Sequence, residues 1–374
     1  MVTLKNYGDP TVYSNDDKAQ AVYALPGYHE APVMATSHVC CKTVKGDGNE
    51  LTKDAEVGLV NYLVASIFSQ LDVMQGDHLV SQSNNCYSYR SFIESVLSYS
   101  DDTLASQFSI GLFYKDTPKH EEMELDGGNL GFVWRAKLTA LSRTIELLGH
   151  LHRDLFFQEK LLLNGVDVKI KLMCSEDTFC LMGSAAEGFK LLIVSAFLFV
   201  KKVRVAPGVC LGHAEALLTA NAKYPVDHVG MKAFSIPASS RVSKQENLFL
   251  GQLPKTLVLG FVDNDAFSGS YAKNPFHFKH YDINFVAWYV DGEHIPTKPL
   301  QPDSKARHCM REYMNLVQMA GKHMKDHFLL INHEEFEQGY TLFTFDLSPN
   351  QECANLYSRI KTGILRAEIR LGRL

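Results

Sequence analysis

The chain has 374 residues, of which 46% are hydrophobic and 21% are charged, and its formal net charge at pH 7 is −5. This composition is that of a globular protein long enough for two domains, and it lacks the basic surplus that dominates nucleic-acid binding. Its eight cysteines form no C-x-x-C pair, and no basic stretch followed by an apolar core opens the chain. Neither a zinc ribbon nor a secreted disulfide framework is therefore expected.

The first strands are predicted after an irregular start. Residues 1–29 carry scattered Asp, Asn, Gly and Pro among few apolar positions, and we expect an irregular N-terminal arm there. Strand patterns follow at 59–64, at 67–74 and, after a Gly76-Asp77 turn, at 78–80. Together they predict the first hairpins of a β domain.

Two short helices are predicted between these strands and the next ones. Apolar side chains recur at helical spacing from Tyr87 to Tyr99, which predicts an amphipathic helix. Ser100 stands before two aspartates and is expected to cap a second helix that runs to Gln107. Inserted helices of this kind favour an elaborated jelly roll over a minimal sandwich.

The strongest hairpin signal is Asn164-Gly165, because a type I′ turn needs positive φ at both central residues. The strand that follows, 166–172, alternates apolar and charged side chains, and its apolar set is expected to face the core. Residues 191–200 form the most apolar run, about half the roughly 20 residues that a membrane helix needs. We predict a buried strand there and no membrane span.

The second half repeats the logic of the first. Pro207 opens a predicted linker helix that extends to residue 222. A hairpin is predicted at Asp291-Gly292, and a helix at 304–319. The apolar face of that helix is expected to hold Met310, Tyr313, Met314 and Val317. Strands are predicted at 257–262, 283–290 and 340–347.

These patterns predict a mainly β protein with two β-rich domains and inserted short helices. The first domain is expected at 30–206 and the second at 223–374, with the linker helix 207–222 between them. No identity-level internal repeat is found, so the similarity of the two domains rests on their parallel organisation and on a family resemblance.

Six segments carry that resemblance through their order along the chain. They are Val57-Gly-Leu-Val-Asn-Tyr, Asn85-Cys-Tyr-Ser-Tyr-Arg, Leu112-Phe-Tyr-Lys-Asp-Thr, His152-Arg-Asp-Leu-Phe-Phe, Asn247-Leu-Phe-Leu-Gly-Gln and Gly339-Tyr-Thr-Leu-Phe-Thr. The chain resembles the double jelly-roll major capsid protein, or hexon, of Polinton/Maverick elements and adintoviruses. The likeness covers most of the sequence after the N-terminal arm.

The resemblance implies two consecutive jelly rolls standing side by side in a homotrimer of pseudo-sixfold outline. Such trimers tile an icosahedral shell with neighbouring trimers, penton proteins and minor capsid proteins. The implied location is the virion capsid, or otherwise the nucleus or cytoplasm of a host cell. Family members usually continue with another apolar strand beyond 366–371. We therefore expect a second jelly roll truncated at its C-terminal strand, in a genome-integrated copy that is unable to form shells unaided.

The sharpest enzyme-like pattern is His150-Leu-His152 followed by Glu159. Cupins are jelly rolls that bind a metal through an H-x-H pair and a later Glu, and two histidines at i and i+2 share one strand face. The Glu lies farther from the pair here than in cupins, so ordinary surface histidines are the competing interpretation. A jelly-roll metalloenzyme is accordingly the third hypothesis for function.

Two further patterns invite a chemical interpretation and have a plain alternative. Asp263-Asn-Asp265 resembles the start of a calcium loop, but Ser268 and Asn274 stand where such a loop has Gly and Glu, and a simple turn after a strand is the alternative. His308-Cys309 offers a Cys/His pair, with further histidines nearby, but no Gly-rich elbow accompanies it. These further histidines are His277, His280 and His294.

No phosphate-binding or dinucleotide-binding glycine motif occurs. Aromatic residues are dense between 276 and 289, and with Lys279 as the one lysine or arginine among them they indicate a β core and subunit contacts more than a nucleic-acid platform. These aromatic residues are Phe276, Phe278, Tyr281, Phe285, Trp288 and Tyr289. We nominate no catalytic, cofactor-binding or metal-binding residue and expect a structural protein. The alternative is a host-adopted jelly-roll module that recognises glycans or proteins through its loops.

Overall fold

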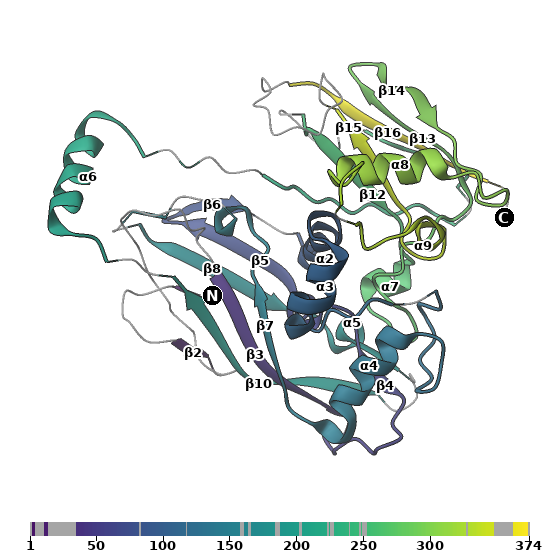
Figure 1. Cartoon of the computed structure of the whole chain (residues 1–374), viewed down its shortest axis with the longest axis horizontal. Coiled ribbons are helices and arrows are strands. Elements are labelled where there is room, and N and C mark those ends of the chain that lie inside the picture. The colour runs from purple at the N-terminus through teal and green to yellow at the C-terminus, as the bar shows by residue number, and fades with distance from the viewer. Residues whose placement is uncertain are drawn as a thin grey trace.

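The computed structural model (Figure 1) describes most of the chain. The residues described are 2–3, 11–13, 35–81, 84–116, 118–157, 161–163, 166–183, 188–201, 204–222, 224, 228–238, 240–246, 248, 253–326, 328–347 and 362–372. The predicted Asn164-Gly165 hairpin, Glu159 and most of the predicted arm 1–29 lie outside these residues.

Two four-stranded antiparallel sheets form the first half, with strand orders β1-β8-β5-β6 and β2-β10-β3-β7. Their strands are β1 (Val2–Thr3), β2 (Thr11–Tyr13), β3 (Ala35–Lys45), β5 (Phe68–Gln75), β6 (His78–Ser81), β7 (Ile145–His150), β8 (Val168–Cys174) and β10 (Phe189–Val200). A small third sheet pairs β4 (Val57–Leu59) with β9 (Leu181–Gly183). From β3 onward the chain crosses repeatedly between the two large sheets, as it does in a jelly roll.

The second half packs a four-stranded sheet against a two-stranded one (Figure 1). The larger sheet has the order β11-β16-β13-β14, and the smaller sheet pairs β12 with β15. The bounds are β11 (Val242–Gln245), β12 (Thr256–Gly260), β13 (Ile283–Val290), β14 (Glu293–Leu300), β15 (Leu342–Asp346) and β16 (Leu365–Leu371). Trp288 of β13 meets Phe345 of β15 edge to face, with ring centroids 5.9 Å apart, so the two sheets share a core.

Helices are inserted between the strands of both halves. The α-helices are α1 (Leu63–Ser66), α2 (Tyr87–Ser98), α3 (Asp101–Ser106), α4 (Leu130–Thr139), α5 (Asp177–Cys180), α6 (Pro207–Thr219), α7 (Asn264–Ser268), α8 (Met310–Met319) and α9 (His333–Glu337). Short 3₁₀ turns are η1 (Gln107–Gly111), η2 (Ala140–Ser142) and η3 (Asp154–Phe156). No helix within the described ranges combines the length and the apolar composition that a membrane crossing needs.

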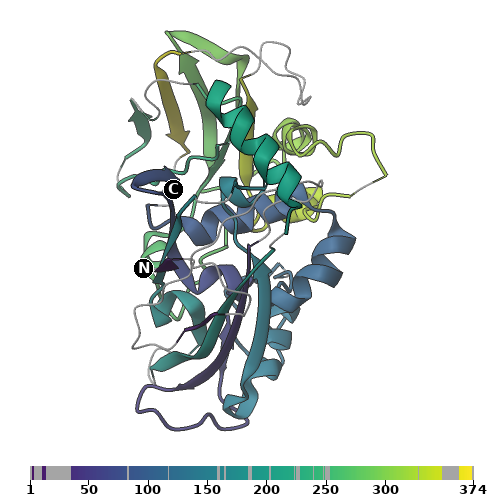
Figure 2. The same ribbon diagram turned by 90° about the vertical axis from the view of Figure 1, so that its left-hand side faces the viewer.

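The two halves lie against each other (Figure 2), and they share buried contacts. Phe92 of α2 stacks on Phe276 with ring centroids 4.2 Å apart and an interplanar angle of 7°. Phe276, Phe278 and Tyr340 belong to the same buried cluster as the core of the first half. This shared cluster joins residues on both sides of the predicted linker helix. The residue boundaries predicted for the two domains stay predictions.

Most sequence patterns with a local cause are confirmed. The predicted helix at 87–99 is α2, the predicted linker helix is α6 with Pro207 at its first turn, and the strand at 283–290 is β13. The Asp291-Gly292 turn joins β13 to β14, and both of its residues have positive φ. At these places, the local periodicity of apolar residues and the turn residues were sufficient to predict the secondary structure.

Three predictions were wrong in whole or in part. The strand predicted at 59–64 ends at Leu59, because Tyr62 turns the chain with a φ of 53° and α1 follows. The helix predicted from residue 304 begins only at Met310, and it directs Leu316 inward while Met310 and Met314 are exposed. The run 191–200 is a strand, as predicted, but it is only half-buried, because residues such as Leu192 and Val194 of β10 face outward. The stretch that is buried throughout is instead 57–68.

Candidate functional site

The two histidines of the H-x-H pair have different surroundings. His150 is exposed, and its Nδ1 lies 3.4 Å from the Thr36 hydroxyl. His152 is buried, and its Nε2 lies 2.8 Å from the Tyr62 hydroxyl. Within the part of the chain that the structure describes, no group of three or more His, Cys, Asp or Glu side chains is placed to hold a metal ion. The described contacts of the pair therefore give no support to the cupin-like interpretation.

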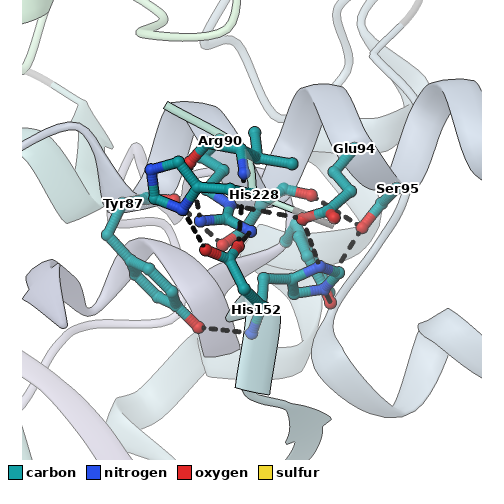
Figure 3. A network of polar contacts seen from close by, with 10 residues as sticks. Tyr87, Arg90, Glu94, Ser95, His152 and His228 are labelled. Atoms are coloured by element: carbon teal, nitrogen blue, oxygen red, sulfur yellow. Dashed lines mark hydrogen bonds and ion pairs between the residues drawn. The ribbon is translucent and has the colours of Figure 1, made fainter. Parts of the chain in front are cut away.

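A buried ion-pair network is built around Asp154 of η3. Its carboxylate accepts a hydrogen bond from the Arg90 guanidinium and lies 2.7 Å from His228 Nδ1. Arg90 also donates to the Val229 carbonyl at 3.1 Å. The Arg90 and Asp154 side chains are 3% and 2% exposed. The network fixes the segment 228–229, where the chain returns after α6, to the first half (Figure 3).

Glu94 of α2 and His152, which precedes η3, extend this network (Figure 3). Glu94 Oε2 lies 3.4 Å from His152 Nδ1 and 3.6 Å from Arg90 Nε. Burial alone would raise the pKa of Glu94, but the His152 hydrogen bond and the Arg90 charge outweigh it and hold that pKa below its ordinary value. A carboxylate kept charged in this way holds its neighbours in place and is a poor proton donor.

A second polar layer joins the first half to the second. Arg135 of α4 is fully buried and donates to the Asp116 carboxylate at 2.7 Å. The other Asp116 oxygen accepts from Asn274 Nδ2 at 2.9 Å, and the Tyr340 hydroxyl donates to the Asp116 carbonyl at 3.2 Å. Burial opposes the charge on Asp116, yet the Arg135 charge prevails and its pKa is lowered. These residues and those described next form the inter-half seam.

Two imidazoles stack across this seam. The rings of His120 and His277 have centroids 4.7 Å apart and an interplanar angle of 6°. Burial lowers the pKa of His120 to about 4, although the Asp116 carboxylate acts in the opposite direction. Gly339 lies against the His120 ring, where a Cβ atom would stand 2.4 Å from Nε2, so a larger residue there would displace the ring.

Asp263 is neutralised by cations of the protein itself. Its Oδ2 lies 2.6 Å from Lys279 Nζ and 3.1 Å from Lys273 Nζ, and the Tyr281 hydroxyl donates to its other oxygen. Lys279 also lies 2.9 Å from Glu121 of the first half. Asp263 is the residue before α7, so a helix begins where a calcium loop would run. The alternative of a turn after a strand fits this geometry.

The Cys/His candidates are dispersed. Cys309 is buried with its Sγ 3.8 Å from the Ser304 hydroxyl, and burial raises its pKa to about 12. A thiol of this kind is a weak nucleophile at neutral pH. His280 lies 3.5 Å from Asp282, and the His294 ring packs on Tyr289.

The aromatic residues between 276 and 289 divide by burial. Phe276, Phe278 and Trp288 are buried core residues, as the β-core interpretation predicts. Tyr281, Phe285 and Tyr289 are half-buried, and guanidinium groups of Arg370 and Arg366 lie over the last two rings, 4.4 Å and 4.3 Å from the ring centroids. These rings serve intramolecular packing.

A shallow cavity of about 370 Å³ opens at the seam. It is lined by His277, Lys279, His280, Tyr281, Asp282, Glu337, Gln338 and Gly339. Sequence reasoning missed the cavity because its walls come from two segments that only the fold brings together. It also missed the buried charges Arg90, Asp116, Arg135 and Asp154, because the partner of each lies 19 or more residues away in the sequence.

No protein-family model matches the chain. It is 24% identical over 320 residues to Uncharacterized protein F54H12.2 of Caenorhabditis elegans, covering 84% of this chain and 74% of that protein. Among solved structures it is similar to a chain of the Sputnik virophage determined by cryo-electron microscopy, with a TM-score of 0.56, 10% identity, and coverage of 98% of this chain and 80% of that one.

This chain has the double jelly-roll fold of viral capsid proteins. The crystal structure of PBCV-1 VP54, fitted into a reconstruction of Sputnik, matches with a TM-score of 0.49 at 9% identity and covers 98% of this chain and 85% of its own. The double jelly roll expected from the sequence is confirmed as the fold by the similarity to the Sputnik chain and by the sheet topology. Function does not follow from fold alone.

Proposed function

We propose that this double jelly-roll chain is a structural, hexon-like capsid subunit that assembles as a homotrimer and has no catalytic role. The observation that carries the proposal is the match to the Sputnik virophage chain along 98% of this sequence, which includes both sets of sheets and the connection between them. A likeness confined to one jelly roll would fit many lectin-like and enzymatic proteins equally well.

The inter-half seam supports the proposal because a shell subunit needs two barrels held in one fixed orientation. Lys115 of the first half lies 2.6 Å from Glu335 of the second, and the buried Arg135, Asp116 and Asn274 form a continuous chain of hydrogen bonds. Networks of this kind, with every member satisfied, rigidify a structure. These buried polar residues thus fix the two halves in one relative orientation.

The outer surface also supports assembly. Large apolar side chains are exposed on several flanks, and contiguous exposed apolar surface marks interaction sites. The clearest examples are Leu192, Val194 and Phe199 on β10, Leu211 and Leu218 on α6, and Met310 and Met314 on α8. A trimer interface buries such side chains, since obligate interfaces resemble a domain core cut in half.

The proposal extends to partners and origin. The expected partners are neighbouring trimers and the penton and minor capsid proteins of one particle, and the expected location is the virion. The ordered segments quoted from the sequence favour the Polinton/Maverick and adintovirus hexons as nearest kin, in a genome-integrated copy.

Light scattering coupled to size-exclusion chromatography tests the proposal. The expected result is a stable species with three times the 41.9 kDa mass of one chain. A well-folded monomer at all accessible concentrations would contradict the trimer. Electron microscopy of the same sample tests the last step, because clean closed shells from this chain alone would show that no helper is needed.

The seam cavity favours a second candidate, a binding module. Its volume lies at the lower end of the roughly 300–1,000 Å³ typical of ligand pockets, and most of its lining side chains are polar. A glycan array and a peptide array would test it. Saturable binding that is lost in Lys279→Ala, in a protein that stays monomeric, would favour the module over the capsid subunit.

A further inference from the structure

The two halves differ in the size of the sheets that face each other. The first half contains two sheets of four strands each, whereas the second half packs its four-stranded sheet against a sheet that, in the described residues, consists of β12 and β15. A two-stranded sheet is marginally stable in water by itself, and a third strand or a packing surface is needed for stability. The small sheet of the second half is therefore the place in the described fold where a further strand would contribute most.

The outer edge of β12 carries unpaired backbone groups. The Leu347 N–H donates to the Lys255 carbonyl at 2.7 Å, which fixes the phase of the ladder, so alternate residues from Lys255 onward bond to β15. Thr256, Val258 and Gly260 therefore direct their N–H and C=O groups away from β15. Among the residues that the structure describes, these groups have no hydrogen-bond partner. An open row of donors and acceptors of this kind is a template for another strand.

The side chains of β12 do not protect this edge. Proteins protect sheet edges with lysines, prolines, bulges or very short strands. Thr256, Val258 and Gly260 are exposed and uncharged, and β12 contains no proline and pairs with β15 without a bulge. Leu257 and Leu259 face the opposite way and are buried in the core of the second half. We call the exposed side of β12, with Thr256, Val258 and Gly260, the open β12 edge.

The other outer strands of the described sheets are protected or covered. β1 and β2 have two and three residues, and β6 has four residues and an irregular register. β7 carries the Glu146 carboxylate, β11 carries Lys244, and β14 contains Pro296 and Pro299. β4 and β9 are buried strands of three residues, and β15 is buried along 342–345 with α8 packed on it. Within the described part of the chain, the open β12 edge alone is exposed, uncharged and regular.

The sequence of β12 suits pairing with a second copy of itself. In an antiparallel pair centred on Val258, this residue lies opposite the partner's Val258, and Thr256 lies opposite the partner's Gly260. The residues of each such pair exchange both of their backbone hydrogen bonds, and no charged side chain stands opposite another. The Lys255 side chains, which precede the strand, are then at opposite ends of the contact. Such a contact is isologous and closes after two copies.

We propose that two copies of this chain join through their open β12 edges, so that the β12–β15 sheets of both copies form one continuous antiparallel sheet. The joined sheet has four strands, as the large sheets of one chain do. The inference rests on the proposed function for the neighbouring trimers, because a two-fold contact of this kind links one trimer to the next. The pairing itself needs only two chains, so it can be tested apart from the trimer.

A lysine at position 258 tests the pairing by light scattering. At high concentration the wild-type trimer is expected to form a species with six times the 41.9 kDa mass of one chain. Val258→Lys places two ammonium groups opposite each other across the two-fold axis, and like charges in that position are destabilising. The larger species should disappear while the trimer remains. Thr297→Lys, at an exposed position of the proline-containing strand β14, is the matched control and should keep the larger species.

Charge reversal at the same position distinguishes a lost contact from a lost fold. Val258→Glu should also abolish the larger species, because two carboxylates then stand opposite each other. A mixture of the lysine and glutamate variants should restore it, because each pair then has opposite charges. A mixture of Thr297→Lys and Thr297→Glu should form no more of it than the wild type. Circular dichroism confirms that each variant is folded.

The outcomes separate the two proposals. A trimer that forms no larger species, or a larger species that survives Val258→Lys, overturns the pairing and leaves the capsid proposal standing, with the edge left to a strand of another protein or to none. A wild-type dimer that dissociates in Val258→Lys and never reaches a trimer supports the pairing and contradicts the homotrimer. A monomer at every concentration overturns both. Restoration by the mixed variants supports the pairing.

Discussion

The Asp154 carboxylate lies between two cationic partners from different parts of the chain. Arg90 comes from α2, and His228 comes from the segment that follows α6. Of the two, only His228 reaches the solvent, with 67% of its side chain exposed. A buried charge deprived of its partner costs much more than the pair contributes in net stability. The arginine is therefore the residue most sensitive to loss of Asp154.

We predict that Asp154→Ala lowers the free energy of unfolding by about 3–5 kcal/mol, because it leaves the Arg90 guanidinium buried with only the more distant Glu94 as counter-charge. Equilibrium urea unfolding measures the change. His228→Ala should cost no more than about 1 kcal/mol, since its side chain is mostly in water.

Asp167→Ala provides the control for this series, because Asp167 is an exposed aspartate immediately before β8 and its loss should change stability by no more than about 0.5 kcal/mol. Equal effects of Asp154→Ala and Asp167→Ala would show that the buried network contributes nothing to stability.

At the scale of elements, the β13–β14 hairpin shows that the residues of a turn can determine where two strands are joined. Its two turn residues, Asp291 and Gly292, have φ values of 51° and 94°. The Asp291 carboxylate also accepts a hydrogen bond from the Ile364 backbone N–H at 2.9 Å, which ties the turn to the start of β16. Open space surrounds Gly292, so a side chain would fit there. The turn requires glycine because of the positive φ and not because of steric crowding.

Replacement of Gly292 by valine should therefore destabilise the protein by about 1–2 kcal/mol through backbone strain alone. Gly292→Asn should cost less, because asparagine tolerates positive φ better than other residues. Thermal unfolding of the two variants in parallel measures the difference. An asparagine variant as unstable as the valine variant would indicate that the turn depends on the absence of any side chain.

Elements with a local cause could be predicted from the sequence, and those determined by distant contacts could not. The period of apolar side chains located α2 correctly, and positive-φ residues located the β13–β14 turn. The face of α8 was predicted wrongly because Glu312 and Leu316 point inward, a choice made by the strands it packs on. Residues 59–64 are buried throughout, so they carry no period that separates strand from turn and helix.

The buried charges were beyond sequence reasoning for the same reason. Asp116 and Asn274 are separated by 158 residues, and Lys115 and Glu335 by 220. A single sequence contains no local signal for such pairs. The absence of a nominated catalytic or metal-binding residue stays a prediction, whereas the double jelly-roll fold, which came from the ordered resemblance, is confirmed.

At the scale of the whole molecule, the inter-half seam should make the free energy of unfolding depend on pH in the acid range. His120 has a folded-state pKa of about 4 because it is buried, below the ordinary value of 6.5. It faces Asp116, Glu121, Glu335 and the stacked His277 ring. A base with a lowered folded-state pKa binds its proton more readily in the unfolded chain, so stability falls as the pH drops from 6.5 towards 4.

The carboxylate on the seam extends this dependence to lower pH. The His277 ring nitrogen, 3.4 Å from the Glu121 carboxylate, and the Lys279 ammonium, 2.9 Å from it, outweigh burial and lower the pKa of Glu121 to about 2, from an ordinary value of 4.5. Its contribution is complete above pH 4.5 and is lost as the pH falls towards 2. Acid therefore weakens the seam in two successive windows, the first from the imidazole and the second from the carboxylate.

We predict that His120→Gln removes most of the pH dependence in the first window, which for a shift from 6.5 to about 4 corresponds to about 3 kcal/mol. The measurement is the free energy of unfolding by urea at intervals between pH 7 and pH 4.5, and the quantity compared is its slope with pH. The slope is informative even where glutamine packs less well against Gly339. His78→Gln, at an exposed position on β6, should keep the wild-type slope. An unchanged slope in His120→Gln would place the acid-sensitive group elsewhere and leave the seam a purely structural contact.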